Sequence, residues 1–200
     1  MRIHEPFITP VARRLAGGPL TPHAVTLASV PPALLAGVCA GLGWFEGAAL
    51  LFGLSGVLDL LDGALARALA RRTDFGALLD SSLDRVADAC VPIGLVVYYA
   101  PHGIVAAIPA LFLLASLWIS YIRARAQSLG LDLPRLWMRR EDRFVALVLA
   151  LLLARWVAPG AALPAPLLLW VLGIVAVLGF VAGAMALAHA ARQARQTPPQ

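Results

Sequence analysis

Long apolar runs separated by short polar segments dominate this sequence. Runs of roughly 20 apolar residues recur, which is the length that a helix needs to cross the hydrocarbon core of a bilayer. We place spans at about residues 24–43, 47–70, 76–98, 103–122, 144–158 and 164–188, and the fifth can begin before residue 143. The pattern predicts an all-α polytopic membrane protein with six transmembrane helices and without internal repeats.

The first 18 residues have a different pattern. One side of a helix here would be apolar and another basic, which favours an interfacial helix on the membrane surface over a disordered tail. We therefore divide the chain into an amphipathic interfacial segment (1–18), a transmembrane domain (19–192) and a polar tail (193–200). No convincing cleavable signal peptide is present, so the first apolar segment is expected to remain as a span.

Composition supports a membrane protein and narrows its partners. The chain is 60% hydrophobic and 14% charged, and its net charge is +5 with arginine as the only basic residue type besides histidine. The arginines cluster between apolar segments, so membrane headgroups and phosphates are better partners than nucleic acid. Cys39 and Cys90 match no metal or redox spacing and are expected to be small buried side chains.

The placement of the arginines predicts the orientation in the membrane. Basic residues precede the first span, follow the second, fill the segment between the fourth and fifth, and end the chain, whereas the loops on the opposite side carry only Arg155. We expect the protein to lie in the inner membrane. By the positive-inside rule, both termini and the loop after the second span then lie in the cytoplasm. A site near that loop would open to the cytosol and the inner leaflet.

Four carboxylates, which are costly inside a membrane, lie on the second and third spans. About 100° per residue separates neighbours on a helix, so Asp59 and Asp62 share one face, and Asp80 and Asp84 share another. Two such faces packed together would enclose four acids that need cations, and divalent ions such as Mg²⁺ with oxygen ligands are the natural partners. Two metals held by shared carboxylates suit a substrate with phosphates. The alternative is a polar cluster that only holds helices together.

The wider pattern is D-x2-D-G-x2-A-R-x8-G-x3-D-x3-D, from Asp59 to Asp84. It resembles the signature of the CDP-alcohol phosphatidyltransferase (phosphotransferase) family at every fixed position, and the resemblance extends over about residues 20–145. It implies transfer of a phosphatidyl-type group from a CDP-lipid such as CDP-diacylglycerol to an alcohol, with release of CMP.

The resemblance also implies roles for the residues of this motif. Two Mg²⁺ ions, or Mn²⁺, would be held by Asp59, Asp62, Asp80 and Asp84, and Asp84 would also be the general base for the acceptor hydroxyl. The nucleotide would be bound through Gly63, Ala66, Arg67 and Gly76. Asp88, one turn further along, is as well explained by an arginine partner as by a role in the site.

The start of the first span reads Pro22-His23-x-x-Thr26. A proline near a helix start favours simple capping. The family often carries Pro-Asn-x-x-Thr here, close to the nucleotide, and His23 departs from that pattern.

A second group of residues follows the fourth span. The sequence Ser-Tyr-x-Arg-Ala-Arg resembles the phosphatidylinositol-phosphate synthase branch of the family and implies that a phosphorylated acceptor, inositol phosphate, binds to Ser120, Arg123, Arg125, Arg140 and Arg143. The arginines can also be explained by the positive-inside signal alone. A homodimer is expected as well. The alternative functions are phosphatidylglycerophosphate synthase, which uses glycerol 3-phosphate, and, from a different class, a small cation transporter.

Overall fold

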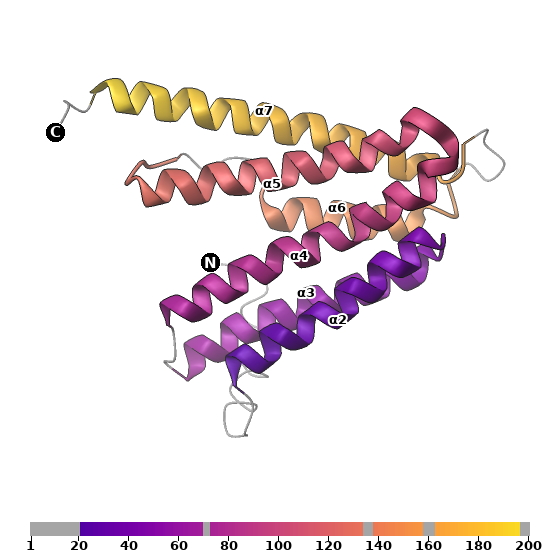
Figure 1. Cartoon of the computed structure of the whole chain (residues 1–200), viewed down its shortest axis with the longest axis horizontal. Coiled ribbons are helices and arrows are strands. Elements are labelled where there is room, and N and C mark those ends of the chain that lie inside the picture. Colours follow the sequence, from indigo (N-terminus) through magenta and orange to yellow (C-terminus); the bar gives the residue numbers. More distant parts are fainter. Residues whose placement is uncertain (1–20, 70–72, 134–137, 158–162, 197–200) are drawn as a thin grey trace. The chain divides into compact units, whose positions relative to one another are not determined.

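Helices make up nearly all of the regular structure in the computed structural model, which describes residues 21–69, 73–133, 138–157 and 163–196. These residues contain no strand, so the predicted all-α class is confirmed. Figure 1 labels the helices, and their bounds are α2 (Pro22–Gly41), α3 (Phe45–Ala68), α4 (Asp74–Tyr99), the 3₁₀ segment η1 (Ala100–Ala106), α5 (Ala107–Ser128), α6 (Arg140–Leu153) and α7 (Pro166–Gln196).

Four stretches of the described chain are long and apolar enough to cross a membrane, and they are Pro22–Gly41, Phe45–Ala68, Asp74–Ser128 and Pro166–Gln193. The third contains α4, η1 and α5 in succession. Large apolar side chains such as Leu50 and Trp170, each 71% exposed, cover the outside of these helices, as lipid-facing residues do. The chain is therefore a multi-pass membrane protein. The predicted interfacial segment 1–18 lies outside the described residues.

Several helices extend further than the apolar runs that predicted them. Helix α5 continues to Ser128 rather than ending near residue 122, and α7 continues to Gln196 rather than 188. Helix α6 begins at Arg140, before Arg143, and has only 14 residues. Alanine, arginine and glutamine, which follow the apolar run of α5, are good helix formers, so the helix continues beyond the apolar run.

The chain forms two compact units, Met1–Gly94 and Leu95–Gln200. In the first unit α2 packs against α3, and glycines let α2 approach the backbone of α4. A Cβ atom on Gly37 would lie 2.5 Å from the carbonyl oxygen of Cys90, and one on Gly94 would collide with the carbonyl oxygen of Gly37. The absence of side chains at Gly37 and Gly94 therefore lets the backbones of α2 and α4 come close together.

In the second unit α5 and α7 pack together through another pair of glycines. A Cβ atom on Gly183 would lie 2.6 Å from the ring of Trp118, and one on Gly179 would lie 3.2 Å from the side chain of Ala115. The hydroxyl of Tyr99 donates a 2.9 Å hydrogen bond to the carbonyl oxygen of Ala165, which joins the start of this unit to the segment before α7.

Candidate functional site

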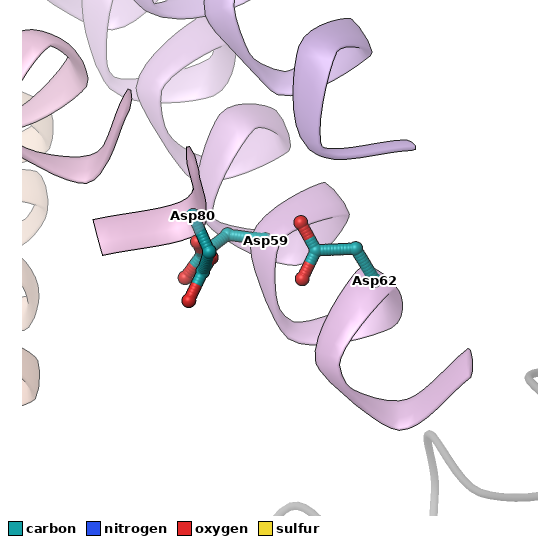
Figure 2. A group of neighbouring side chains, drawn as sticks. All are labelled: Asp59, Asp62 and Asp80. Atoms are coloured by element: carbon teal, nitrogen blue, oxygen red, sulfur yellow. The ribbon is translucent and has the colours of Figure 1, made fainter. Parts of the chain in front are cut away.

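Three carboxylates meet in the first unit. Asp59 and Asp62 lie on α3 and Asp80 lies on α4, and one oxygen from each can be chosen so that all three lie within 4.8 Å of one another. Figure 2 shows the three side chains converging from the two helices. Such a group of oxygen donors has the composition of a site for a hard divalent cation.

The local sequence explains why these helices bring the acids together. Helix α3 ends at Ala68 and α4 begins at Asp74, so the last turns of one helix lie close in the chain to the first turns of the other. The hydroxyl of Thr73 accepts a 3.0 Å hydrogen bond from the backbone N–H of Gly76, and Asp74 places a negative charge in the first turn of α4. Both features stabilise a helix N-terminus and so define where α4 begins.

Burial differs among the three acids. Asp62 is only 4% exposed, and its Oδ2 atom has no hydrogen-bond partner among the described residues, whereas Asp59 and Asp80 are half-buried. A buried, unsatisfied carboxylate oxygen is costly unless a cation compensates it. The orphaned oxygen and the all-carboxylate donor set therefore fit a divalent metal ion.

Helix α2 forms another wall of this site. Thr26, which is 6% exposed, lies near the Asp62 carboxyl, and its hydroxyl donates a 3.0 Å hydrogen bond to the carbonyl oxygen of Pro22. His23 lies against the start of α4, where a Cβ atom on Gly76 would be 3.0 Å from the imidazole Cε1 atom. The His23 ring also makes an edge contact with Phe75 at a centroid distance of 6.0 Å.

The residues expected to bind the nucleotide surround the end of α3. Gly63 and Ala66 are half-buried, and Arg67 is exposed. A Cβ atom on Gly63 would be 3.6 Å from the Nη1 atom of Arg67, so the guanidinium lies back over this glycine. Gly76 has little free space, because Thr73 Oγ1 and His23 would both be 3.0 Å from an added Cβ atom.

Asp84 follows Asp80 by one turn of α4 and is half-buried, but it does not belong to the close group of three carboxylates. Asp88, a further turn along, is also half-buried and has interactions with its surroundings. The structure thus brings together three of the four expected metal ligands in the described part of the chain.

In the second unit a buried arginine organises part of the expected acceptor site. Arg143 is 5% exposed, and its Nη2 donates a 3.3 Å hydrogen bond to the hydroxyl of Ser120 while its Nη1 donates a 2.7 Å bond to the carbonyl oxygen of Met138. Ser120 in turn donates to the carbonyl oxygen of Ser116 at 2.8 Å. The guanidinium is therefore held between α5 and the segment that leads into α6.

The other expected acceptor residues are more accessible. Arg125 is exposed and contacts the hydroxyl of Ser128 at 3.4 Å, whereas Arg123 and Arg140 are half-buried. The structure brings together Ser120 and Arg143 from this set.

Two contacts were not anticipated from the sequence. Met138 has a positive φ of 66° and its carbonyl oxygen accepts a hydrogen bond from Arg143, and the residue type gives no indication of this conformation. The position of Thr26 near Asp62 is partly indicated by the sequence, since Thr26 belongs to the motif at the start of the first span. That motif predicts helix capping and a place near the nucleotide, and it does not predict proximity to the acids.

Comparison with known proteins adds to this geometry. The family model described as CDP-alcohol phosphatidyltransferase matches residues 20–182. The chain is 39% identical over 145 residues to the archaetidylinositol phosphate synthase of Methanothermobacter thermautotrophicus, which covers 71% of this chain and 70% of that protein. It is 33% identical over 148 residues to the phosphatidylinositol phosphate synthase of Cutibacterium acnes, with 72% of each chain covered.

The fold is similar to crystal structures of Mycobacterium tuberculosis phosphatidylinositol phosphate synthase. The form with CDP-DAG bound gives a TM-score of 0.79 at 27% identity and covers 92% of this chain and 94% of that one. The complex with manganese and citrate gives a TM-score of 0.80 at 28% identity, with 92% and 88% covered.

Proposed function

The chain belongs to the CDP-alcohol phosphatidyltransferase family, and from this premise we propose that it transfers a phosphatidyl group from CDP-diacylglycerol to a hydroxyl of inositol phosphate and releases CMP. The group of Asp59, Asp62 and Asp80, within the complete family motif, is the observation that carries the proposal. The acceptor assignment is supported by the names of the relatives and by the arginines of the second unit.

On the donor side, we assign the carboxylates of Asp59, Asp62, Asp80 and Asp84 to two Mg²⁺ ions, with Mn²⁺ as a substitute. When bound, divalent cations would offset the negative charge of the pyrophosphate and polarise the phosphoryl group under attack.

The nucleotide is assigned to the end of α3 and the start of α4. Gly63 and Ala66 carry a small or absent side chain, which leaves room beside the end of α3, and Gly76 lets His23 of α2 lie against the start of α4. Arg67, whose guanidinium lies over Gly63, can pair with a phosphate oxygen.

Asp84 supplies the proton acceptor. Its carboxylate takes the proton of the acceptor hydroxyl as the hydroxyl oxygen forms a bond to the phosphorus of the phosphatidyl group. The bond from that phosphorus to the oxygen bridging to CMP breaks, and the electron pair leaves with CMP. The half-buried position of Asp84, one turn from Asp80, is compatible with this role.

The phosphate of the acceptor is assigned to Ser120, Arg123, Arg125, Arg140 and Arg143. A guanidinium can donate two parallel hydrogen bonds to a phosphate, and a serine hydroxyl can add a third. Choline and ethanolamine carry no phosphate of their own, so they leave these arginines without a function. Glycerol 3-phosphate has the required charge and is the alternative acceptor.

The membrane arrangement follows the arginine pattern. We propose that α2 to α7 each cross the inner membrane, that the acids open to the cytoplasm, and that the protein works as a homodimer. The segment 1–18 is assigned to the membrane surface.

The decisive experiment measures CMP release by the purified protein in lipid nanodiscs, from CDP-diacylglycerol with a panel of acceptor alcohols. We expect inositol phosphate to give the highest kcat/KM. Activity with glycerol 3-phosphate alone would preserve the phosphate assignment and overturn the inositol assignment. Equal activity with free inositol or ethanolamine would overturn the acceptor site.

A further inference from the structure

One peptide group just before α6 is hydrogen-bonded at both of its polar atoms by two consecutive residues of that helix. Its carbonyl oxygen belongs to Met138 and accepts a 2.7 Å hydrogen bond from Nη1 of Arg143. Its N–H belongs to Arg139 and donates a 2.9 Å hydrogen bond to Oδ2 of Asp142. Rotation of this peptide group would break both bonds, so Asp142 and Arg143 together hold it in one orientation.

The two bonds hold the backbone in a conformation that it does not prefer. Met138 has a φ of 66°, in the left-handed region that residues with a Cβ atom adopt only rarely. Asp142 is the third residue of α6, and its bond to the N–H of Arg139 is the one that this position makes in a capping box. The N–H of Arg143 then donates to the carbonyl oxygen of Arg139 at 3.2 Å. The Asp142 carboxylate therefore stabilises both the left-handed turn and the start of the helix.

The position of the Arg143 guanidinium depends on this arrangement. Arg143 is 5% exposed, and its Nη2 donates a 3.3 Å hydrogen bond to the hydroxyl of Ser120 on α5. That hydroxyl donates its own hydrogen to the carbonyl oxygen of Ser116 at 2.8 Å, so the guanidinium bonds on both sides to groups that are themselves held in place. A side chain that is already ordered loses less conformational entropy when it binds a ligand.

We propose that Asp142, an exposed residue outside the expected acceptor set, is a positioning residue for the acceptor site, because its carboxylate holds the peptide group that orients Arg143. The inference rests on the proposed binding of a phosphorylated acceptor by Arg143. An acid next to these arginines in the chain can only weaken their attraction for an anion through its charge. Its hydrogen bond to the backbone gives it a different effect, which is to order the arginine that follows it.

The first test measures CMP release by the full-length protein in nanodiscs, with the concentration of each substrate varied in turn. Asp142→Ala removes the hydrogen-bond acceptor, whereas Asp142→Asn keeps an acceptor oxygen and removes the charge. We expect Asp142→Ala to raise the KM for inositol phosphate about 3- to 30-fold, the effect of losing one capping hydrogen bond, and to leave the KM for CDP-diacylglycerol unchanged. Asp142→Asn should behave nearly as the wild type does. The matched control is Glu141→Ala, which removes an exposed acid from the same turn and should change neither KM.

The second test needs no substrate. Hydrogen exchange at the Arg139 amide is followed by mass spectrometry in the same nanodiscs. This amide should exchange faster in Asp142→Ala than in the wild type, because its hydrogen bond is lost. The rate should be nearly unchanged in Asp142→Asn, whose side-chain oxygen still accepts the bond.

The outcomes separate this inference from the acceptor assignment. If Asp142→Ala leaves the KM for inositol phosphate unchanged, or raises both KM values by the same factor, the positioning role is overturned and the acceptor assignment stands. If Asp142→Asn or Glu141→Ala has the same effect as Asp142→Ala, charge acts rather than the hydrogen bond, and the positioning role is again overturned. If the wild type uses no phosphorylated acceptor, the proposed function fails and this inference fails with it, whatever the exchange of the Arg139 amide shows.

Discussion

Asp62 is the residue whose surroundings best reveal the chemistry of the site. The sequence places it on a membrane helix beside Asp59, where an ionisable side chain carries a large free-energy cost of desolvation. The structure adds that it is 4% exposed and that one of its oxygens lacks a hydrogen-bond partner in the described chain. Helical spacing predicted the shared face of the two acids, whereas the burial depends on how α2 covers α3 and could not be read from spacing.

Asp80→Asn tests the acidic group directly. The substitution keeps the size of the side chain and removes one ligand charge, so divalent binding should weaken and CMP release should fall at least a hundredfold at limiting Mg²⁺. Insertion into the membrane should be unchanged. CMP release is measured across a Mg²⁺ titration, with Asp74→Asn, an exposed acid at the start of α4, as the control. Near-wild-type turnover at limiting Mg²⁺ would contradict the metal role.

Arg143→Ala and Arg125→Ala test the acceptor assignment. Loss of one charged partner of a desolvated phosphate should cost about 2–5 kcal/mol, or roughly 1.5 to 3.5 orders of magnitude in kcat/KM for inositol phosphate. The buried Arg143 should be nearer the upper limit than the exposed Arg125. The KM for CDP-diacylglycerol should change little. Arg155→Ala is the control, and equal effects on both substrates would argue against an acceptor role.

At the scale of helices, hydropathy located each α-helix that the structure describes, but it gave the helix ends imprecisely and did not predict the 3₁₀ segment η1. Apolar runs report the part of a helix suited to lipid, so the polar last turns of α5 and α7 were missed. The 14-residue α6 was found because its apolar face continues from Leu147 to Leu153, and its start depends on a local contact. The Asp142 carboxylate accepts a 2.9 Å hydrogen bond from the N–H of Arg139 there. The positions of the acidic residues in the sequence do not by themselves predict this hydrogen bond.

Gly94→Ala tests the close approach of α2 and α4. An added Cβ atom would collide with the backbone carbonyl of Gly37, and backbone yields less readily than a side chain. Such overpacking should lower stability by about 1–3 kcal/mol, which corresponds to a fall of about 2–12 °C in the Tm. Thermal unfolding in detergent gives the measurement. Gly53→Ala is the matched control, because no atom lies within 4 Å of its added Cβ. Equal Tm values for the two variants would contradict the close packing.

At the scale of the whole molecule, the sequence predicted a single transmembrane domain, and the structure has two compact units whose boundary along the chain falls after Gly94, within α4. The acids belong to the first unit, and Ser120 and Arg143 belong to the second. Two separate resemblances in the sequence predicted these sets, and the roles of their residues stay predictions. The division between the units has no such local signal, since α4 is continuous through Gly94.

The orientation of the whole chain is tested by labelling cysteines in intact cells and in inverted membrane vesicles. Arginine asymmetry puts the connection between α3 and α4 in the cytoplasm and the connection between α4 and α5 on the opposite side. In a background lacking Cys39 and Cys90, we expect Thr73→Cys to react with a membrane-impermeant maleimide only in inverted vesicles. His102→Cys, an exposed position in η1, should react only in intact cells. Both variants should still release CMP, which shows that they are folded. Labelling of Thr73→Cys from outside intact cells would reverse the topology and place the acids away from the cytoplasm.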